Sequence, residues 1–233
     1  MRDFNNEGSG ADNGAKRFFD WAYGGRAKTV ADLDAGTDMP PEKVFLSFLT
    51  HTPAFISDGP EGLNACIKGV GFLPKEQYLA AALKDYLAHI KSYEPGDRDY
   101  GKRGLKLLIK HLYGADAKER VDFSRLGSLE MAFKHSWGNY NADSRASLLF
   151  YRPPAISYEL KGVIEIRGGR HGANDKTPPE SLDIYQQYVN AQHDCYHTPD
   201  ISLWKTRPAY LFRIREVYDK SASKSGFGTR LEL

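Results

Sequence analysis

Two short stretches of the chain carry the side chains best suited to chemistry. The first, KHSWGNYNAD, begins at Lys134 and combines a lysine, a histidine, a serine, a tryptophan and two asparagines. Charged, hydroxyl and aromatic groups beside a buried strand are typical of a ligand pocket. Together with a basic strand expected near the C-terminus, this run is the best candidate for a ligand site. No G-x-G-x-x-G or G-x-x-x-x-G-K-[ST] loop occurs, so no motif names the reaction.

The second stretch is HDCYH, which begins at His193. His193 and His197 are four residues apart and would share one face of a helix, where Asp194 or Cys195 could complete a divalent-metal site. Alternatively, the histidines only bind the last carbonyl groups of a helix that stops before Pro199. Cys195 could also act as a nucleophile if a pocket held it as a thiolate. The other histidines are interpreted as structural or solvated: His51, His89, His111 and His171.

The strongest structural pattern follows directly after the first stretch. Residues 145–167 predict two adjacent antiparallel strands joined at Pro153-Pro154, and the second strand alternates apolar with polar residues. A sheet backed by a core therefore positions the candidate site. The apolar face of that strand is expected to contain Ile156, Tyr158, Leu160, Ile164 and Ile166. A last strand at residues 207–219 is expected to place Tyr210, Phe212, Ile214 and Tyr218 on one face.

The remaining segments predict helices and one hairpin. A first helix is expected from Ala15 to the glycine pair Gly24-Gly25, and a short strand at residues 128–133. A hairpin is expected over residues 54–70, around a turn at residues 58–62. Further helices are expected to begin at Pro40-Pro41 and to cover residues 74–93 and 101–114, and an amphipathic helix is expected over residues 179–197.

Composition sets a general frame for function. The 233 residues are 41% apolar and 27% charged, as in an ordinary globular protein, and residues 1–14 are expected to form a flexible tail. A net charge of +2, from 32 basic and 30 acidic residues, is far from that of a dedicated nucleic-acid binder. Two cysteines without a C-x-x-C pair, no signal-peptide core and no long apolar run together predict a cytoplasmic protein without a membrane partner.

The order of these segments resembles the flavin-binding split-barrel proteins, the superfamily of pyridoxamine 5'-phosphate oxidase. The resemblance covers roughly half of the chain and is carried by Asn139, Arg145 and residues 147–151, 162–166 and 217–219. It implies an α+β fold, in which an antiparallel split β-barrel carries additional N-terminal and inserted helices. The implied domain is a single one over residues 15–233, with the helical insertion at about residues 74–114.

The resemblance also implies a cofactor and a site. It implies an FMN-binding protein that acts as an oxidoreductase on a small molecule and forms a homodimer. In such a reaction no side chain need act as a general base. Some proteins of this fold hold a deazaflavin or haem instead of FMN. A phosphate needs charged or hydroxyl donors, and a flavin ring needs an aromatic or apolar wall. The candidate phosphate ligands are Lys134, His135 and Ser136, with Trp137 at the ring, Asn139 at its polar edge, and Arg145 or Arg152 as a second charge. The alternatives are a metal-dependent enzyme that uses His193 and His197, and a non-catalytic binding protein.

Overall fold

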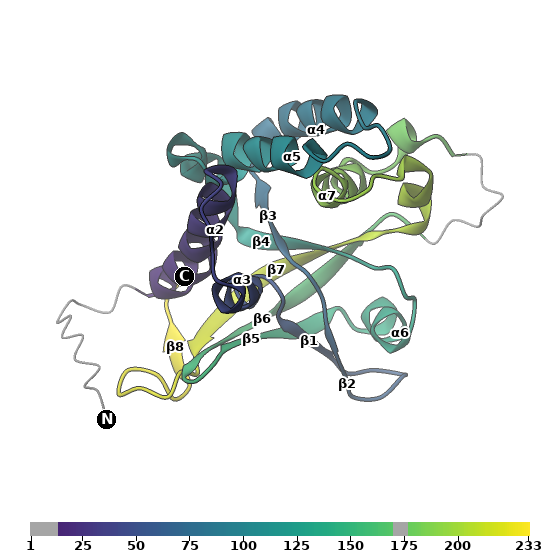
Figure 1. Cartoon of the computed structure of the whole chain (residues 1–233). Helices are drawn as coiled ribbons and strands as arrows, with labels where there is room; N and C mark the ends of the chain where they lie inside the picture. The colour runs from purple at the N-terminus through teal and green to yellow at the C-terminus, as the bar shows by residue number, and fades with distance from the viewer. Residues whose placement is uncertain (1–13, 170–176) are drawn as a thin grey trace.

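The structure is a computed structural model that describes residues 14–169 and 177–233 (Figure 1). The predicted tail, except for Gly14, and His171 lie outside the described residues. Eight strands form one antiparallel sheet: β1 (Ala54–Ser57), β2 (Asn64–Ile67), β3 (Gly71–Pro74), β4 (Val121–Leu129), β5 (Arg145–Arg152), β6 (Ile156–Arg167), β7 (Ala209–Asp219) and β8 (Thr229–Leu231). The strand order is β2-β1-β5-β6-β7-β4-β3, and β8 pairs with β7. The predicted α+β class is confirmed.

Helices account for most of the other described residues. A helix at the N-terminus runs through α1 (Lys16–Phe19), a π-helical turn (Asp20–Gly24) and α2 (Gly25–Asp34). The others are α3 (Pro41–Phe48), α4 (Glu76–Lys91), α5 (Tyr100–Leu108) with a π-helical turn (Ile109–Tyr113), α6 (His135–Ala142) and α7 (Ile184–Asp194). Three 3₁₀ segments cover Ala115–Arg120, Pro179–Ser181 and Ile201–Thr206. The helices predicted from Pro40-Pro41, over residues 74–93 and over residues 101–114 are confirmed.

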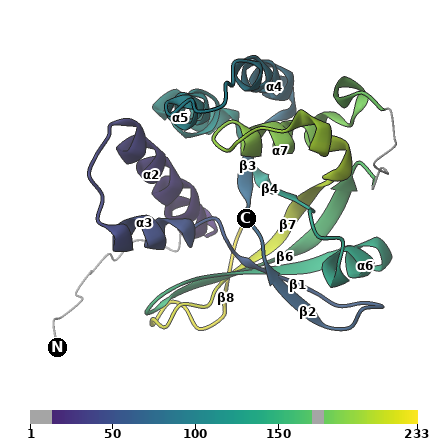
Figure 2. The same ribbon diagram turned by 45° about the vertical axis from the view of Figure 1, so that its right-hand side comes forward.

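The sheet is curled into an open barrel. Strands β2 and β3 stand at opposite ends of the strand order, yet only residues 68–70 join them. Four Cα steps span at most about 14 Å, whereas six flat inter-strand spacings would separate the two ends by about 29 Å. The sheet must therefore curve until its ends approach, and the curvature can be followed in Figure 2. No pairing joins β2 to β3 among the described strands, so the barrel is not closed.

The predicted strands at the centre of the sheet are confirmed, except that the side chains at the end of β7 face the opposite side from the prediction. Strands β5 and β6 pair antiparallel; Tyr158, Leu160 and Ile164 are buried and the other two predicted inward residues are half-buried. Strand β7 carries a bulge at Arg215, which has no partner between the pairs that Ile214 and Glu216 form with β6. A bulge moves all later side chains to the opposite face. The prediction that Tyr218 shares the face of Phe212 is therefore wrong, and Val217 is buried instead.

Two other predicted boundaries and the predicted amphipathic character of one helix are wrong. The first helix does not stop at Gly24-Gly25, because the following turns still bury Thr29 and Val30 against the core. The predicted strand at residues 128–133 is the end of β4, and the chain turns at Glu130, whose carboxylate accepts the next backbone N–H groups. Helix α7 is not amphipathic: eight consecutive residues from Tyr185 are buried, because α4 and the strands β4 and β7 surround it.

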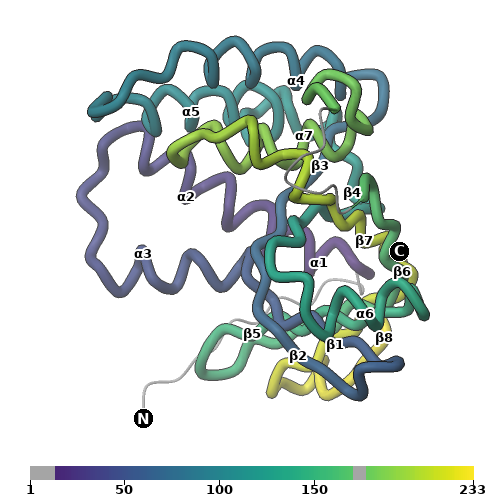
Figure 3. Tube along the Cα trace, turned by 90° about the vertical axis from the view of Figure 1, so that its right-hand side faces the viewer, coloured from purple at the N-terminus to yellow at the C-terminus, as the bar shows by residue number. Residues whose placement is uncertain are grey.

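Helix α6 lies apart from the other helices. Helices α4, α5 and α7 lie together beyond β3 and β4, while α6 lies beside β1 and β2 (Figures 1 and 3). Phe18 of α1 packs edge-on against Phe150 and Tyr158, so the N-terminal helix covers β5 and β6. Among the described residues, no helix combines the length and apolarity needed to cross a membrane.

Candidate functional site

The N-terminal end of α6 presents two of the three predicted phosphate donors to solvent. Lys134 is the N-cap residue and His135 the first helical residue; both are exposed and neither forms an ion pair with any described residue. The first N–H groups of a helix have no intrahelical acceptor, and the helix dipole adds partial positive charge there. This end of α6 is thus a surface suited to an anion.

Ser136 points the other way, into the protein. Its side chain is buried, and its Oγ accepts a hydrogen bond from Asn64 Nδ2 at 2.9 Å and lies 3.1 Å from Cys66 Sγ. These partners belong to β2, so Ser136 joins α6 to the edge strand. The predicted role as a phosphate donor would require this buried hydroxyl to become exposed.

Asn139 braces the turn between β1 and β2. It is fully buried, its Nδ2 donates to Ser57 Oγ at 3.1 Å and to the carbonyl of Gly62 at 2.7 Å, and its Oδ1 accepts from the N–H of Glu61 at 2.9 Å. Both ends of the amide are therefore occupied within the protein. The predicted role at the edge of a flavin ring would require the loss of one of these bonds.

We expect Asn139→Ala to lower the free energy of unfolding by about 2–4 kcal/mol, because it leaves buried partners without a hydrogen bond and creates a cavity. Urea unfolding followed by circular dichroism measures this effect. Asn141→Ala is the matched control in the same helix, since Asn141 is exposed and bonds only to the carbonyl of Trp137; we expect a change within about 0.5 kcal/mol. Equal effects of the two substitutions would show that Asn139 does not brace the turn.

Trp137 forms a half-buried aromatic surface behind the exposed donors. Its ring stacks on Tyr210 of β7 with centroids 6.5 Å apart and meets Phe133 edge-on at 5.0 Å. Lys68 lies over the other ring of this stack, with its Nζ 5.4 Å from the centroid of Tyr210. The indole is therefore held in place and keeps part of its surface free.

A buried carboxylate fixes the loop that carries these groups. Glu130 is 1% exposed; its Oε2 accepts from Lys68 Nζ at 2.9 Å and from the hydroxyl of Tyr210 at 2.8 Å. Its Oε1 accepts from the N–H groups of Ala132 and Phe133 at 2.7 and 2.8 Å. Burial by itself would raise the pKa of Glu130, but the bonds from Lys68 and the backbone hold this pKa below its ordinary value. Glu130 is thus an ionised anchor beneath the site.

The two predicted second charges lie elsewhere. Arg145 is 84% exposed and forms hydrogen bonds with Asp143 at 2.5 and 2.8 Å, so its charge is already matched. Arg152 is half-exposed at the far end of the same strand. Lys134, His135 and Trp137 therefore keep exposed or half-buried side chains in the first turn of α6, and Arg145 is left to be tested as a further phosphate ligand.

Sequence reasoning missed Glu130, Lys68 and Tyr210, which hold the site from three different segments. One signal was available for Glu130, since a carboxylate directly after an apolar strand has to find partners if it is buried. The partners themselves could not be read from the sequence, because Lys68 and Tyr210 come from distant strands.

The histidine pair does not form a metal centre with a third residue of the described part of the chain. The rings of His193 and His197 lie 4.6 Å apart, and Nδ1 of His193 donates to the buried carboxylate of Asp194 at 2.8 Å. That carboxylate also accepts from the indole N–H of Trp204 at 2.8 Å. Within residues 14–169 and 177–233, no three histidine, cysteine or acidic side chains are placed to hold a metal ion. Asp194 instead ties the end of α7 to the segment after it.

Cys195 does not meet the condition for a nucleophile, which is a thiolate in an accessible pocket. Its thiol is fully buried and donates to the carbonyl of Gln192 at 3.1 Å. Burial, and then the charge of Asp194, raise the pKa of the thiol, so the thiolate required for attack is disfavoured.

The curled, open antiparallel sheet and its surrounding helices define an α+β protein of split-barrel type. The solved structures similar to it include HupZ of Group A Streptococcus, with 10% sequence identity and a TM-score of 0.41 over 84% of this chain and 100% of that one. They also include a "putative pyridoxamine 5'-phosphate oxidase" of Lactobacillus delbrueckii, with 12% identity and a TM-score of 0.36 over 77% of this chain and 93% of that one. An F420 reductase is 11% identical, with a TM-score of 0.36 over 72% of this chain and 88% of that one. The similar structures thus include the family that the sequence resembles. At these identities and TM-scores, the similarity concerns the fold alone.

No protein-family profile matches the sequence, and neither does any curated protein. A functional assignment must therefore start from this chain's own residues.

Proposed function

We propose that this protein binds FMN at the N-terminal end of α6 and acts as a flavin-dependent oxidoreductase on a small molecule. The observation that carries the proposal is the pair of exposed donors Lys134 and His135, which form no ion pair with any described residue and stand in the same helical turn as the half-buried Trp137. A ligand with a phosphate at one end and a planar ring at the other matches this order of groups. The family resemblance of the sequence supports the same cofactor.

The residues fit such a ligand in defined roles. Lys134 and His135 would hold the phosphate, helped by the first-turn N–H groups of α6. Trp137 would cover one face of the ring and exclude water from it, and Glu130 would keep the loop in position. FMN supplies a ring that takes up a hydride or electrons when bound. Ser136 and Asn139 hold α6 against the β1–β2 hairpin, so they orient the site through its scaffold.

We expect Lys134→Ala to weaken FMN binding by about tenfold or more, because a charge-assisted bond to phosphate contributes roughly 1.5–3 kcal/mol. Titration of the apo protein with FMN, followed by flavin fluorescence, measures the affinity. Lys106→Ala is the matched control, since Lys106 is exposed on α5 and belongs to no part of the site. Arg145→Ala tests whether that side chain leaves Asp143 to join the phosphate. Absence of saturable binding by the intact protein would refute the proposal, and binding of a deazaflavin or haem alone would change the cofactor.

We also propose that the protein forms a homodimer. Strand pairing places Ile67, Ala54 and Leu149 in one row across β2, β1 and β5, and the first and last of them are 69% and 36% exposed. Strand β2 is also an edge strand of the described sheet. An exposed apolar face next to an open edge is typical of an association surface. A second copy of the chain, as the family resemblance implies, would cover it.

We expect sedimentation equilibrium to show a dimer that Ile67→Glu weakens at least tenfold, because the substitution buries a charge in the interface. Leu63→Glu is the control, since Leu63 is more exposed and lies in the turn outside the row. A monomeric intact protein at all concentrations would contradict the dimer.

A further inference from the structure

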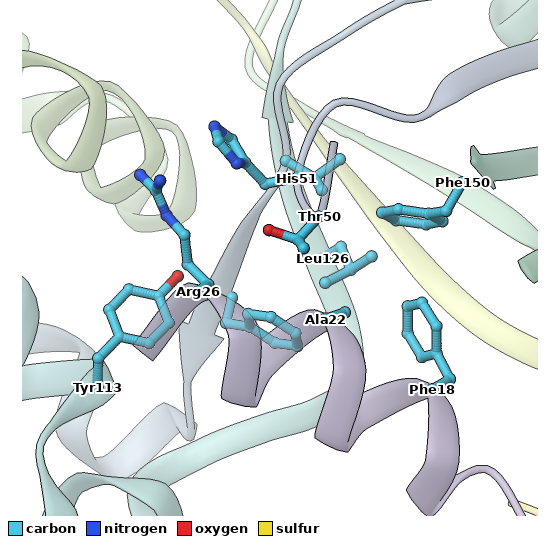
Figure 4. Close-up of a pocket in the computed structure, with 10 residues that line it drawn as sticks. Phe18, Ala22, Arg26, Thr50, His51, Tyr113, Leu126 and Phe150 are labelled. Atoms are coloured by element: carbon cyan, nitrogen blue, oxygen red, sulfur yellow. The ribbon is translucent and has the colours of Figure 1, made fainter. Parts of the chain in front are cut away.

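A cavity lies between the N-terminal helix and the sheet, but it is too small for an organic ligand (Figure 4). Its free volume is about 10 Å³, which is room for a single water molecule. The rings of Phe18 and Phe150 pack edge-on at its apolar end with centroids 5.3 Å apart, and Arg26 is already partnered by the hydroxyl of Tyr113. This cavity therefore takes no ligand larger than water.

Two histidines at the end of α7 are spaced as two ligands of one metal ion would be. The ring centroids of His193 and His197 are 4.6 Å apart. Two imidazole rings on one zinc ion, with zinc–nitrogen bonds of about 2.0–2.1 Å, have centroids about 4.5–5.5 Å apart. The two rings are therefore at a separation at which they can share an ion.

Each of these histidines has a ring nitrogen that the protein does not use. Nδ1 of His193 donates to the carboxylate of Asp194 at 2.8 Å, so in the neutral ring Nε2 carries the lone pair. No described residue forms a hydrogen bond with this Nε2 or with either ring nitrogen of His197. The side chain of His193 is 33% exposed and His197 is exposed, so an ion can reach both from solvent.

Asp194 provides the support that a metal-binding histidine usually has. Such a histidine almost always donates its other ring N–H to a carboxylate or carbonyl, which fixes the ring and its tautomer. Asp194 is fully buried, and its Oδ2 accepts from the indole N–H of Trp204 at 2.8 Å and from the backbone N–H of Asp200 at 3.2 Å. Nη1 of Arg207 lies 3.7 Å from Oδ1, so the carboxylate also balances this neighbouring charge. Asp194 thus holds the ring of His193 in place from behind.

We propose that His193 and His197 bind one zinc ion, with water at its remaining positions. Imidazole nitrogens suit zinc and the neighbouring transition metals, whereas magnesium and calcium prefer oxygen ligands. No third protein ligand belongs to the described part of the chain, so the ion stays open to solvent. The pair lies outside α6, and the proposal does not depend on FMN binding.

Calorimetric titration of the full chain with zinc chloride at neutral pH, after removal of metals with a chelator, tests the proposal. We expect saturable binding of one zinc ion per chain. His193→Ala and His197→Ala should each weaken it at least tenfold, because a single imidazole remains. Thr198→Ala is the control, since Thr198 is exposed and adjoins His197 in the chain. Absence of saturable binding by the intact protein, or unchanged binding by His197→Ala, would overturn the proposal.

Asp194→Asn tests the positioning role of the carboxylate. An amide whose oxygen accepts from Trp204 turns its NH2 group toward His193, which moves the ring proton from Nδ1 to Nε2. Zinc binding should then weaken at least tenfold, and nitrogen NMR of His193 should show the Nε2–H tautomer in place of the Nδ1–H tautomer. Unchanged zinc affinity in the folded variant would overturn this role. If the variant does not fold, the tautomer of His193 in the intact protein decides, and an Nε2–H tautomer there would overturn it.

Discussion

Glu130→Ala is expected to lower the free energy of unfolding by about 3–5 kcal/mol, because it leaves the charge of Lys68, the buried hydroxyl of Tyr210 and two backbone N–H groups without their acceptor. Urea unfolding at neutral pH measures the loss. Glu130→Gln should lose less, since its amide oxygen still accepts a hydrogen bond. Glu119→Ala is the matched control, because Glu119 is exposed and should change stability by no more than about 0.5 kcal/mol. A loss of less than about 1 kcal/mol in Glu130→Ala would exclude its role as an anchor.

The effect of Glu130 should also depend on pH. Its pKa is lower in the folded protein than its ordinary value of 4.5. A lowered pKa means that the carboxylate stabilises the fold fully above about pH 4.5 and loses this contribution as the pH falls through the folded-state pKa. The difference in stability between the intact protein and Glu130→Ala should therefore be constant from pH 6 to 8 and shrink in acid. A difference that stays constant to pH 2 would show that the charge contributes nothing.

Gly104→Ala is expected to destabilise the protein by at least about 3 kcal/mol, although alanine is by about 1 kcal/mol the better helix former. A Cβ at this position in α5 would lie 1.8 Å from the carbonyl oxygen of Cys195. That oxygen cannot move away easily, because it is bonded to His89 Nε2 at 2.9 Å. The substitution therefore forces α5 away from the end of α7.

Gly101→Ala supplies the contrast within the same helix. The nearest atom to a Cβ there is the carbonyl oxygen of Tyr196 at 3.6 Å, which is an ordinary contact. We expect this variant to be as stable as the intact protein or more stable by up to about 1 kcal/mol. Urea unfolding of the two variants measures the difference between their free energies of unfolding. Equal stabilities would show that α5 does not pack on α7 through Gly104.

Local patterns were sufficient for the elements of this fold that have one buried face. The alternation in residues 145–167 predicted β5 and β6, and the apolar spacing in residues 74–93 predicted α4, because burial of one face repeats with the period of the strand or the helix. The same patterns failed where both faces are covered or a strand is irregular. Helix α7 is buried all round, and the bulge at Arg215 moves Val217 inward without any change in the sequence pattern.

The sequence by itself determined the α+β class, the central strands and the region of the candidate site, since each depends on residues close together in the chain. Only the tertiary structure decided which side chains of that region face solvent and which ones hold the fold together. It turned Lys134 and His135 outward, engaged Asn139 with the β1–β2 turn and anchored the loop through Glu130. Such contacts arise when the sheet curls and brings distant strands together. The partners of a buried charge or amide therefore come from distant parts of the chain, and no local sequence pattern encodes them.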